Sequence, residues 1–179
     1  MTSSARLIAA FVVLIFQVLP SLADECDEIA GRLAANVPGL TFKARYDPKP
    51  PSAGIEPGQI VEVHYQHRFG GTIEIFCYPT TYSMMPVVTA DTDTVYPTAE
   101  FLQFVAKLAA AELGGEWKAL LPSVSRCHRV ALKSRSNSAD VELKSGLIHC
   151  IVYREPDFKK AQFEISKPNR SRHSGSQRP

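Results

Sequence analysis

The segment around residue 64 places a histidine among carboxylates, a combination that supports acid–base chemistry. His64 and Glu62 share the polar face of an alternating strand, and Glu74 is expected nearby on the partner strand. A carboxylate beside an imidazole can orient it as a general base. One prediction is therefore a hydrolase that uses His64 with Glu62 or Glu74. The same pattern is typical of a solvated strand face, and His67 points to the opposite face, so the two histidines cannot share a metal ion.

A second candidate is an anion site in the densest basic stretch of the body. Arg126, Arg129 and Lys133 could bind phosphate or an acidic polymer of the cell envelope. The alternative is the exposed face of an amphipathic helix, neutralised by Asp140 and Glu142. The whole basic stretch comprises Arg126, His128, Arg129, Lys133 and Arg135.

Four cysteines offer redox, metal or structural roles, and their spacing favours the structural one. They contain no C-x-x-C pair, and zinc sites usually bring their ligands in close pairs. Cys26 and Cys127 lie on apolar helical stripes, whereas Cys77 and Cys150 lie on the apolar faces of strands. Sequence order allows three pairings. The inward side-chain directions favour Cys26–Cys77 and Cys127–Cys150, each joining a helix to a sheet.

The N-terminus predicts export. Arg6, an apolar run over 7–19 and small residues at Ser21 and Ala23 are typical of a secretory signal peptide over 1–23, cleaved after Ala23. The apolar run is shorter than a membrane span, so we expect no stable membrane insertion after cleavage. With an even number of cysteines, this predicts an oxidising compartment outside the cytoplasm. The body contains no glycosylation sequon, which favours a periplasmic or secreted protein of bacterial origin. Residues 167–179 are basic and lack large apolar side chains, which predicts a disordered tail.

The body over 24–166 predicts one α+β domain. Helices are expected over 24–37, from Pro97 to Gly114, and over 116–132, giving about three helices on one face of a mainly antiparallel sheet. The expected strands cover 40–46, 60–68, 72–78, 140–144, 147–154 and 161–165, with a short edge strand over 87–90 because prolines flank it. In the first strand, Leu40, Phe42, Ala44 and Tyr46 are expected to share the half-buried face.

Composition and the absence of known motifs exclude several classes of function but do not identify one. The 179 residues carry a net charge of +2, which lacks the basic excess typical of a nucleic-acid-binding protein. No nucleophile elbow, phosphate-binding loop or metalloprotease motif occurs. We expect a non-catalytic binding or structural module without a metal or cofactor, whose partner is an envelope component or another exported protein.

A third candidate surface is the loop-rich segment over 79–96. Its aromatic and methionine side chains are suited to binding, and loops carry function more often than strands do. The residues that could line a groove there are Tyr78, Tyr82, Met84, Met85, Tyr96 and Trp117.

Overall fold

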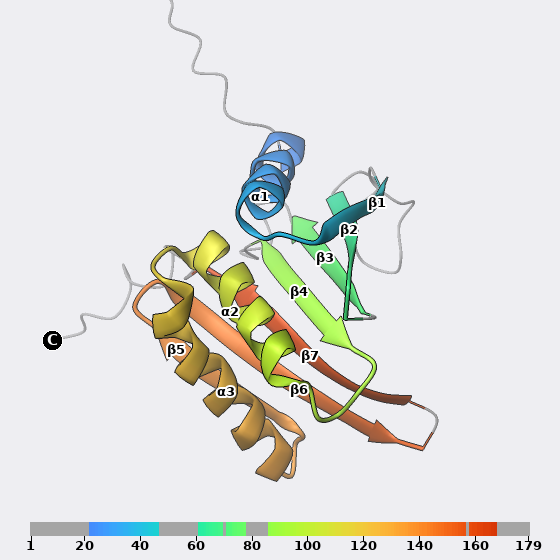
Figure 1. The fold of residues 1–179 in the computed structure, drawn as a ribbon, viewed down its shortest axis with the longest axis vertical. Coiled ribbons are helices and arrows are strands. Elements are labelled where there is room, and N and C mark those ends of the chain that lie inside the picture. Colours follow the sequence, from blue (N-terminus) through green and yellow to red (C-terminus); the bar gives the residue numbers. More distant parts are fainter. Residues whose placement is uncertain (1–21, 47–60, 70, 78–85, 157, 168–179) are drawn as a thin grey trace, which may run out of the picture.

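The computed structural model describes residues 22–46, 61–69, 71–77, 86–156 and 158–167 (Figure 1). Within these ranges, three helices and a seven-stranded antiparallel sheet confirm a mixed α+β fold. The elements in chain order are α1 (Leu22–Asn36), β1 (Leu40–Tyr46), β2 (Val61–His67), β3 (Thr72–Cys77), β4 (Val87–Thr92), α2 (Ala99–Leu113), α3 (Trp117–Lys133), β5 (Ser138–Leu143), β6 (Gly146–Glu155) and β7 (Phe158–Ser166).

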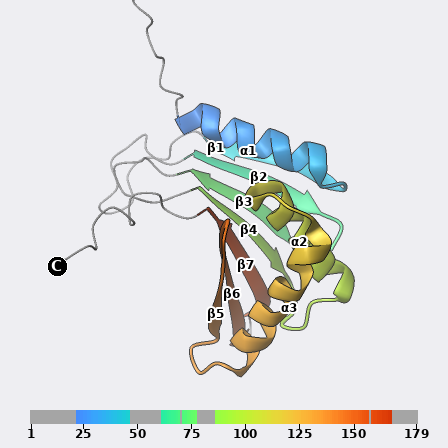
Figure 2. The same cartoon turned by 90° about the vertical axis from the view of Figure 1, so that its left-hand side faces the viewer.

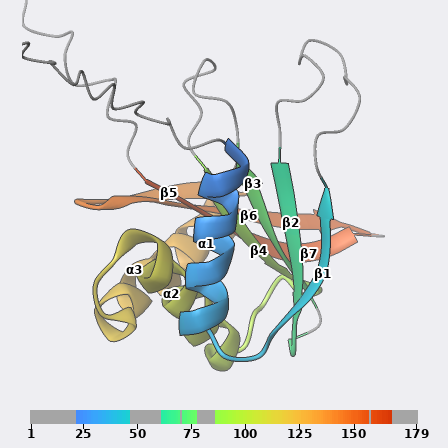
Figure 3. The same ribbon diagram turned by 90° about the horizontal axis from the view of Figure 1, so that it is seen from above.

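The sheet consists of two meanders that meet at its centre. Its strand order is β1-β2-β3-β4-β7-β6-β5, and β4 pairs with β7 over six residues. The prediction of an edge strand over 87–90 was therefore wrong. Pro86 precedes the strand, so every residue from Val87 onward keeps its N–H for the ladder. Figure 3 shows the twist of the sheet, in which the strands at the β1 side cross those at the β5 side.

The core lies between the sheet and the helices. One register-paired row crosses five strands through Val63, Ile75, Val88, Ile165 and Ile148, and each of these side chains is at most 2% exposed. In Figure 2 the three helices lie on the same side of the sheet. Burial of this apolar row against the helices is the main favourable term in folding.

A β-bulge in β1 breaks the alternation expected from the sequence. The register shifts between Phe42 and Ala44, so Phe42 pairs with Tyr65 while Ala44 pairs with His64. Phe42 and Tyr46 consequently lie on opposite faces, and both are exposed. The prediction that the four apolar residues of this strand share one face was wrong, because a bulge inserts one residue and reverses the alternation.

The residues at the two ends of α2 explain where that helix begins and ends. Thr98 caps α2, accepting a hydrogen bond from the N–H of Phe101 at 3.1 Å. Gly114 ends the helix with a φ of 82°, a conformation that glycine adopts at little cost. Helix α3 starts three residues later and continues through Pro122.

Two disulfides join helices to strands in the predicted pairing. Cys26 of α1 is bonded to Cys77 of β3, and Cys127 of α3 is bonded to Cys150 of β6. All four residues are fully buried. No helix within the described ranges is long and apolar enough to span a membrane.

A buried carboxylate adds a polar link among the same elements. Glu112 near the end of α2 has a side chain only 2% exposed, and it pairs with Arg32 of α1 at 2.9 Å and with Lys167 after β7 at 3.3 Å. Removing either cation would leave the buried Glu112 carboxylate with only one positive partner, which would destabilise the domain.

Loss of either disulfide should destabilise the domain without changing its fold. The paired replacements Cys127→Ser with Cys150→Ser, and Cys26→Ser with Cys77→Ser, should each lower the free energy of unfolding by about 2–4 kcal/mol. Loss of the Cys26–Cys77 bond should lower the free energy of unfolding slightly more, because this bond closes a longer loop: its cysteines are 51 residues apart in sequence, against 23 for the other pair. Urea denaturation of residues 24–179 measures both. An unchanged urea midpoint in either double variant would contradict the stabilising role of that disulfide.

Two glycines provide a matched test of packing. A Cβ at Gly71 would lie 2.0 Å from the backbone oxygen of Asp91, whereas a Cβ at the exposed, helical Gly31 would meet nothing within 4 Å. Gly71→Ala should therefore destabilise the domain by about 1–3 kcal/mol. Gly31→Ala should stabilise it by up to about 1 kcal/mol, since alanine is the better helix former. Thermal unfolding measures both variants. If their midpoint temperatures shifted in the same direction from that of the wild type, this description of the packing would be contradicted.

Candidate functional site

The structure brings the three acid–base candidates together on the sheet face opposite the core. His64 Nε2 lies 3.2 Å from Glu62 Oε2, and its Nδ1 lies 3.8 Å from Glu74 Oε1. The ring of Tyr46 packs edge-on against the imidazole at a centroid distance of 4.9 Å. Both ring nitrogens thus face carboxylates. A general base needs one of them to face a nucleophile or water, so one carboxylate would have to move aside.

A second acid–histidine pair lies on the same sheet face. His149 of β6 contacts Asp140 of β5 at 2.5 Å, and pairing across the ladder places Glu164 beside it. His149 neighbours Cys150, which points toward α3. Asp140 and His149 therefore lie on the face away from α3. Glu142, two residues along β5, shares that face.

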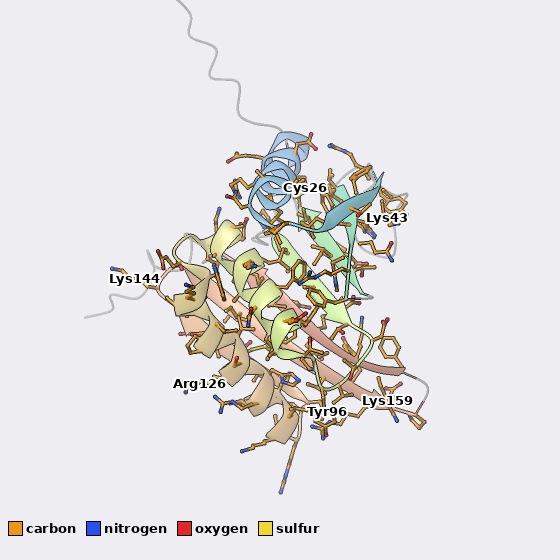
Figure 4. The ribbon with its side chains drawn as sticks, in the orientation of Figure 1. Cys26, Lys43, Tyr96, Arg126, Lys144 and Lys159 are labelled. Carbon is orange, nitrogen blue, oxygen red and sulfur yellow. A yellow bond between two sulfur atoms is a disulfide. The ribbon has the colours of Figure 1, made fainter. Side chains whose placement is uncertain are left out.

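The exposed face of α3 carries the predicted anion-binding cations. Arg126, Arg129 and Lys133 are exposed, while Cys127 and Ala131 are fully buried. In Figure 4, Arg126 lies on the outer side of α3. The alternative, in which Asp140 and Glu142 neutralise these cations, was wrong, because the two-residue period of β5 turns both carboxylates to the other side of the sheet.

His128 does not belong to the basic surface. It is 6% exposed, and its Nε2 lies 2.9 Å from the backbone oxygen of Val95, to which it donates. Burial lowers the pKa of His128, so the side chain is neutral near pH 7. It belongs to the inward stripe that contains Cys127, and counting it with Arg126 and Arg129 was a mistake.

Helix α3 extends the basic surface further toward its N-terminus than the sequence analysis recognised. At about 100° per residue, Lys118, Arg126, Arg129 and Lys133 fall within an arc of about 80°. No carboxylate within the described ranges forms an ion pair with any of these four side chains. Helix α3 itself contains no Asp or Glu. We call these four residues the α3 basic face.

Lys118 was missed because it lies eight residues before Arg126, outside the dense basic run. The signal was present as helical spacing: residues 118, 126, 129 and 133 repeat on one face. The α3 basic face runs about 22 Å along the helix, from a rise of about 1.5 Å per residue. This length suits an extended anion better than a single phosphate.

The remaining candidates divide between described and undescribed parts of the chain. Tyr96 is 74% exposed, whereas Trp117 is half-buried at the start of α3. Tyr78, Tyr82, Met84 and Met85 lie outside the described residues. Within the described ranges, no three His, Cys, Asp or Glu side chains form a group that could hold a metal ion.

Comparisons with protein-family models, with curated proteins and with solved structures gave no match.

A buried histidine at the end of β2 is structural. His67 is packed among aromatic rings, 4.9 Å from the centroid of Phe104 and 5.4 Å from that of Phe101. Its Nδ1 accepts from the N–H of Phe69 at 3.1 Å, so its Nε2 carries the proton donated to the backbone oxygen of Asp91. Burial lowers the pKa of His67. Protonation would convert Nδ1 into a second donor and break its bond to Phe69.

The two buried histidines predict acid sensitivity. Because burial lowers both folded-state pKa values, the unfolded chain binds these protons first as the pH falls. Their contribution is complete above about pH 6.5 and is lost below it, with a slope of up to about 1.4 kcal/mol per pH unit for each histidine. Urea denaturation between pH 7.5 and 5 gives the free energy of unfolding at each pH. This free energy should fall less steeply with decreasing pH for His128→Gln than for the wild type. Identical slopes would contradict this assignment.

Proposed function

We propose that the protein is an exported, non-catalytic binding module whose α3 basic face binds an acidic polymer of the cell envelope. The observation that carries this proposal is the set of four cations on one arc of α3 without a carboxylate partner in the described ranges. Basic side chains clustered on one face attract polyanions and orient them along the cluster.

Charge segregation supports the choice of partner. The body over 24–166 contains 15 Lys and Arg against 18 Asp and Glu, so it is mildly acidic. A cationic strip on such a body attracts an anion to one place rather than to the whole surface. On the opposite sheet face, Glu62, Glu74 and Glu164 would repel the same polymer.

Export is part of the proposal. The signal-like segment over 1–23 and the two disulfides both favour an oxidising compartment outside the cytoplasm. Residues 1–21 lie outside the described ranges, and so does nearly all of the basic tail over 167–179. A bacterial periplasmic or secreted location is consistent with a partner in the envelope.

Hydrolysis remains a second candidate because of one contact, the 3.2 Å approach of His64 to Glu62. The proposal of binding is preferred because the other ring nitrogen faces Glu74 rather than a hydroxyl. His64→Asn would abolish a hydrolytic activity that uses this base, whereas it would leave binding at α3 unchanged. Measuring both properties on the same variant separates the two functions.

The binding proposal predicts a salt-sensitive affinity that depends on α3. The wild-type mature chain should bind polygalacturonate, and its affinity should fall at least about tenfold between 50 and 200 mM salt, as screened charge contacts do. The combined replacements Arg126→Ala, Arg129→Ala and Lys133→Ala should weaken binding at 50 mM salt by at least about tenfold. Isothermal titration calorimetry measures both effects.

A matched control removes three cations elsewhere. Lys43, Lys144 and Lys159 are exposed and have no carboxylate partner within the described ranges. Figure 4 shows them on β1, at the β5–β6 turn and on β7. Their triple alanine variant changes the net charge equally and should retain binding within about threefold. Equal losses in the two triple variants, or a salt-independent affinity, would contradict a specific α3 basic face.

A further inference from the structure

A shallow cavity of about 460 Å³, open to solvent, lies where α3 begins, next to the end of α1 and the outer side of α2. Its size falls within the range of small-molecule sites. The polar and aromatic side chains that line it come from all three helices or the residue before α3: Asn36, Lys107, Glu116, Trp117 and Lys118. Lys118 also belongs to the α3 basic face, so the cavity and that face are continuous.

The cavity is lined by the single tryptophan of the chain, and two ammonium groups lie close to its ring. The Nζ of Lys107 lies 5.3 Å from the centroid of the Trp117 ring, and the Nζ of Lys118 lies 5.9 Å from it. Trp117 also packs against the hydrophobic core, which holds the indole in place. The aromatic surface is therefore fixed, while both ammonium groups sit on flexible four-carbon stems.

The two lysines are available to an anion. No carboxylate within the described ranges forms an ion pair with Lys107 or Lys118, and both ammonium groups contact the indole ring. Either ammonium group can rotate from the ring toward a ligand carboxylate. A cation–aromatic contact at such a site contributes only about 0.5–2 kcal/mol, so a direct charge pair can replace it.

The other polar groups complement hydroxyls. The Nδ2 of Asn36 donates to the backbone oxygen of Arg32 at 2.8 Å, which leaves its Oδ1 to accept from a ligand. Glu116 precedes α3 without forming a side-chain cap, and its carboxylate can accept from a hydroxyl. The lining therefore offers an apolar plate, two cations and two hydrogen-bond acceptors.

We infer that this cavity binds one uronic-acid unit of the polymer that the α3 basic face takes up. A pyranose ring presents C–H groups on one face, which pack against an indole, and its hydroxyls and carboxylate match the acceptors and ammonium groups. A polyphosphate chain lacks the ring and gains nothing from Trp117. This inference rests on the proposed function and adds selectivity for an acidic sugar over an anion of similar charge.

The test compares two probes, polygalacturonate and inorganic polyphosphate, on the full mature chain. Trp117→Leu keeps apolar volume in the core and removes the aromatic plate. It should weaken polygalacturonate binding at least about tenfold and leave polyphosphate binding within about twofold. Tyr96→Leu, which removes a 74% exposed aromatic ring elsewhere (Figure 4), is the matched control and should change neither affinity.

Fluorescence provides a reading on the unmodified protein. Because Trp117 is the only tryptophan, its emission should change more on addition of polygalacturonate, which covers the ring, than on addition of polyphosphate, which reaches only the ammonium group of Lys118 beside it. Equal effects of Trp117→Leu on both probes, or a loss confined to Tyr96→Leu, would overturn the inference while leaving polyanion binding intact. Failure of the wild type to bind either probe would overturn the proposed function, and the inference with it.

Discussion

The packing of the inward stripe of α3 against the sheet, reinforced by the disulfide between Cys127 and Cys150, sets which face of the helix is turned outward. A covalent bond from the middle of the helix to β6 places the inward stripe against the sheet, and the neutral His128 holds the adjacent position through the backbone oxygen of Val95. With both residues facing inward, Arg126 and Arg129 must face solvent. The proposed binding surface depends on this orientation, because a helix free to rotate would not present a fixed row of cations.

The sheet separates charge in a way that the composition conceals. Register pairing lines up His64, Glu74, Glu164, His149 and Asp140 on the face away from the core. The carboxylates of this row are thus separated from α3 by the whole thickness of the sheet and its packed core. This distance lets cations persist without ion pairs on a body that is acidic overall.

Much of the architecture could be predicted because it depends on local periodicity. Inward-facing cysteines on helical and strand stripes identified the correct pairing among three. The position of β4 was mispredicted because strand order depends on contacts distant in sequence, and Pro86 gave a misleading local signal. The bulge in β1 has no comparable signal: it reverses the alternation after Phe42 without a glycine or proline at that point.

The candidate site was predicted only in part, for related reasons. The cations of α3 were recognised, but His128 was grouped with them because proximity in sequence was weighed above helical direction. Asp140 was taken as a neutralising neighbour because it follows the helix closely in sequence, although the strand period points it away. The cavity around Trp117 joins residues of α1, α2 and α3, and such a meeting is set by tertiary packing rather than by any local pattern.

The most direct test of the proposed surface is a residue-resolved binding map in solution. Polygalacturonate would be titrated into the isotope-labelled mature domain while backbone amide resonances are followed by NMR. We expect the shifts to concentrate along the exposed side of α3, from Lys118 to Lys133, and to be negligible around His64 and His149. Shifts concentrated on the opposite sheet face, or spread evenly over the domain, would contradict the assignment of α3 as the binding surface.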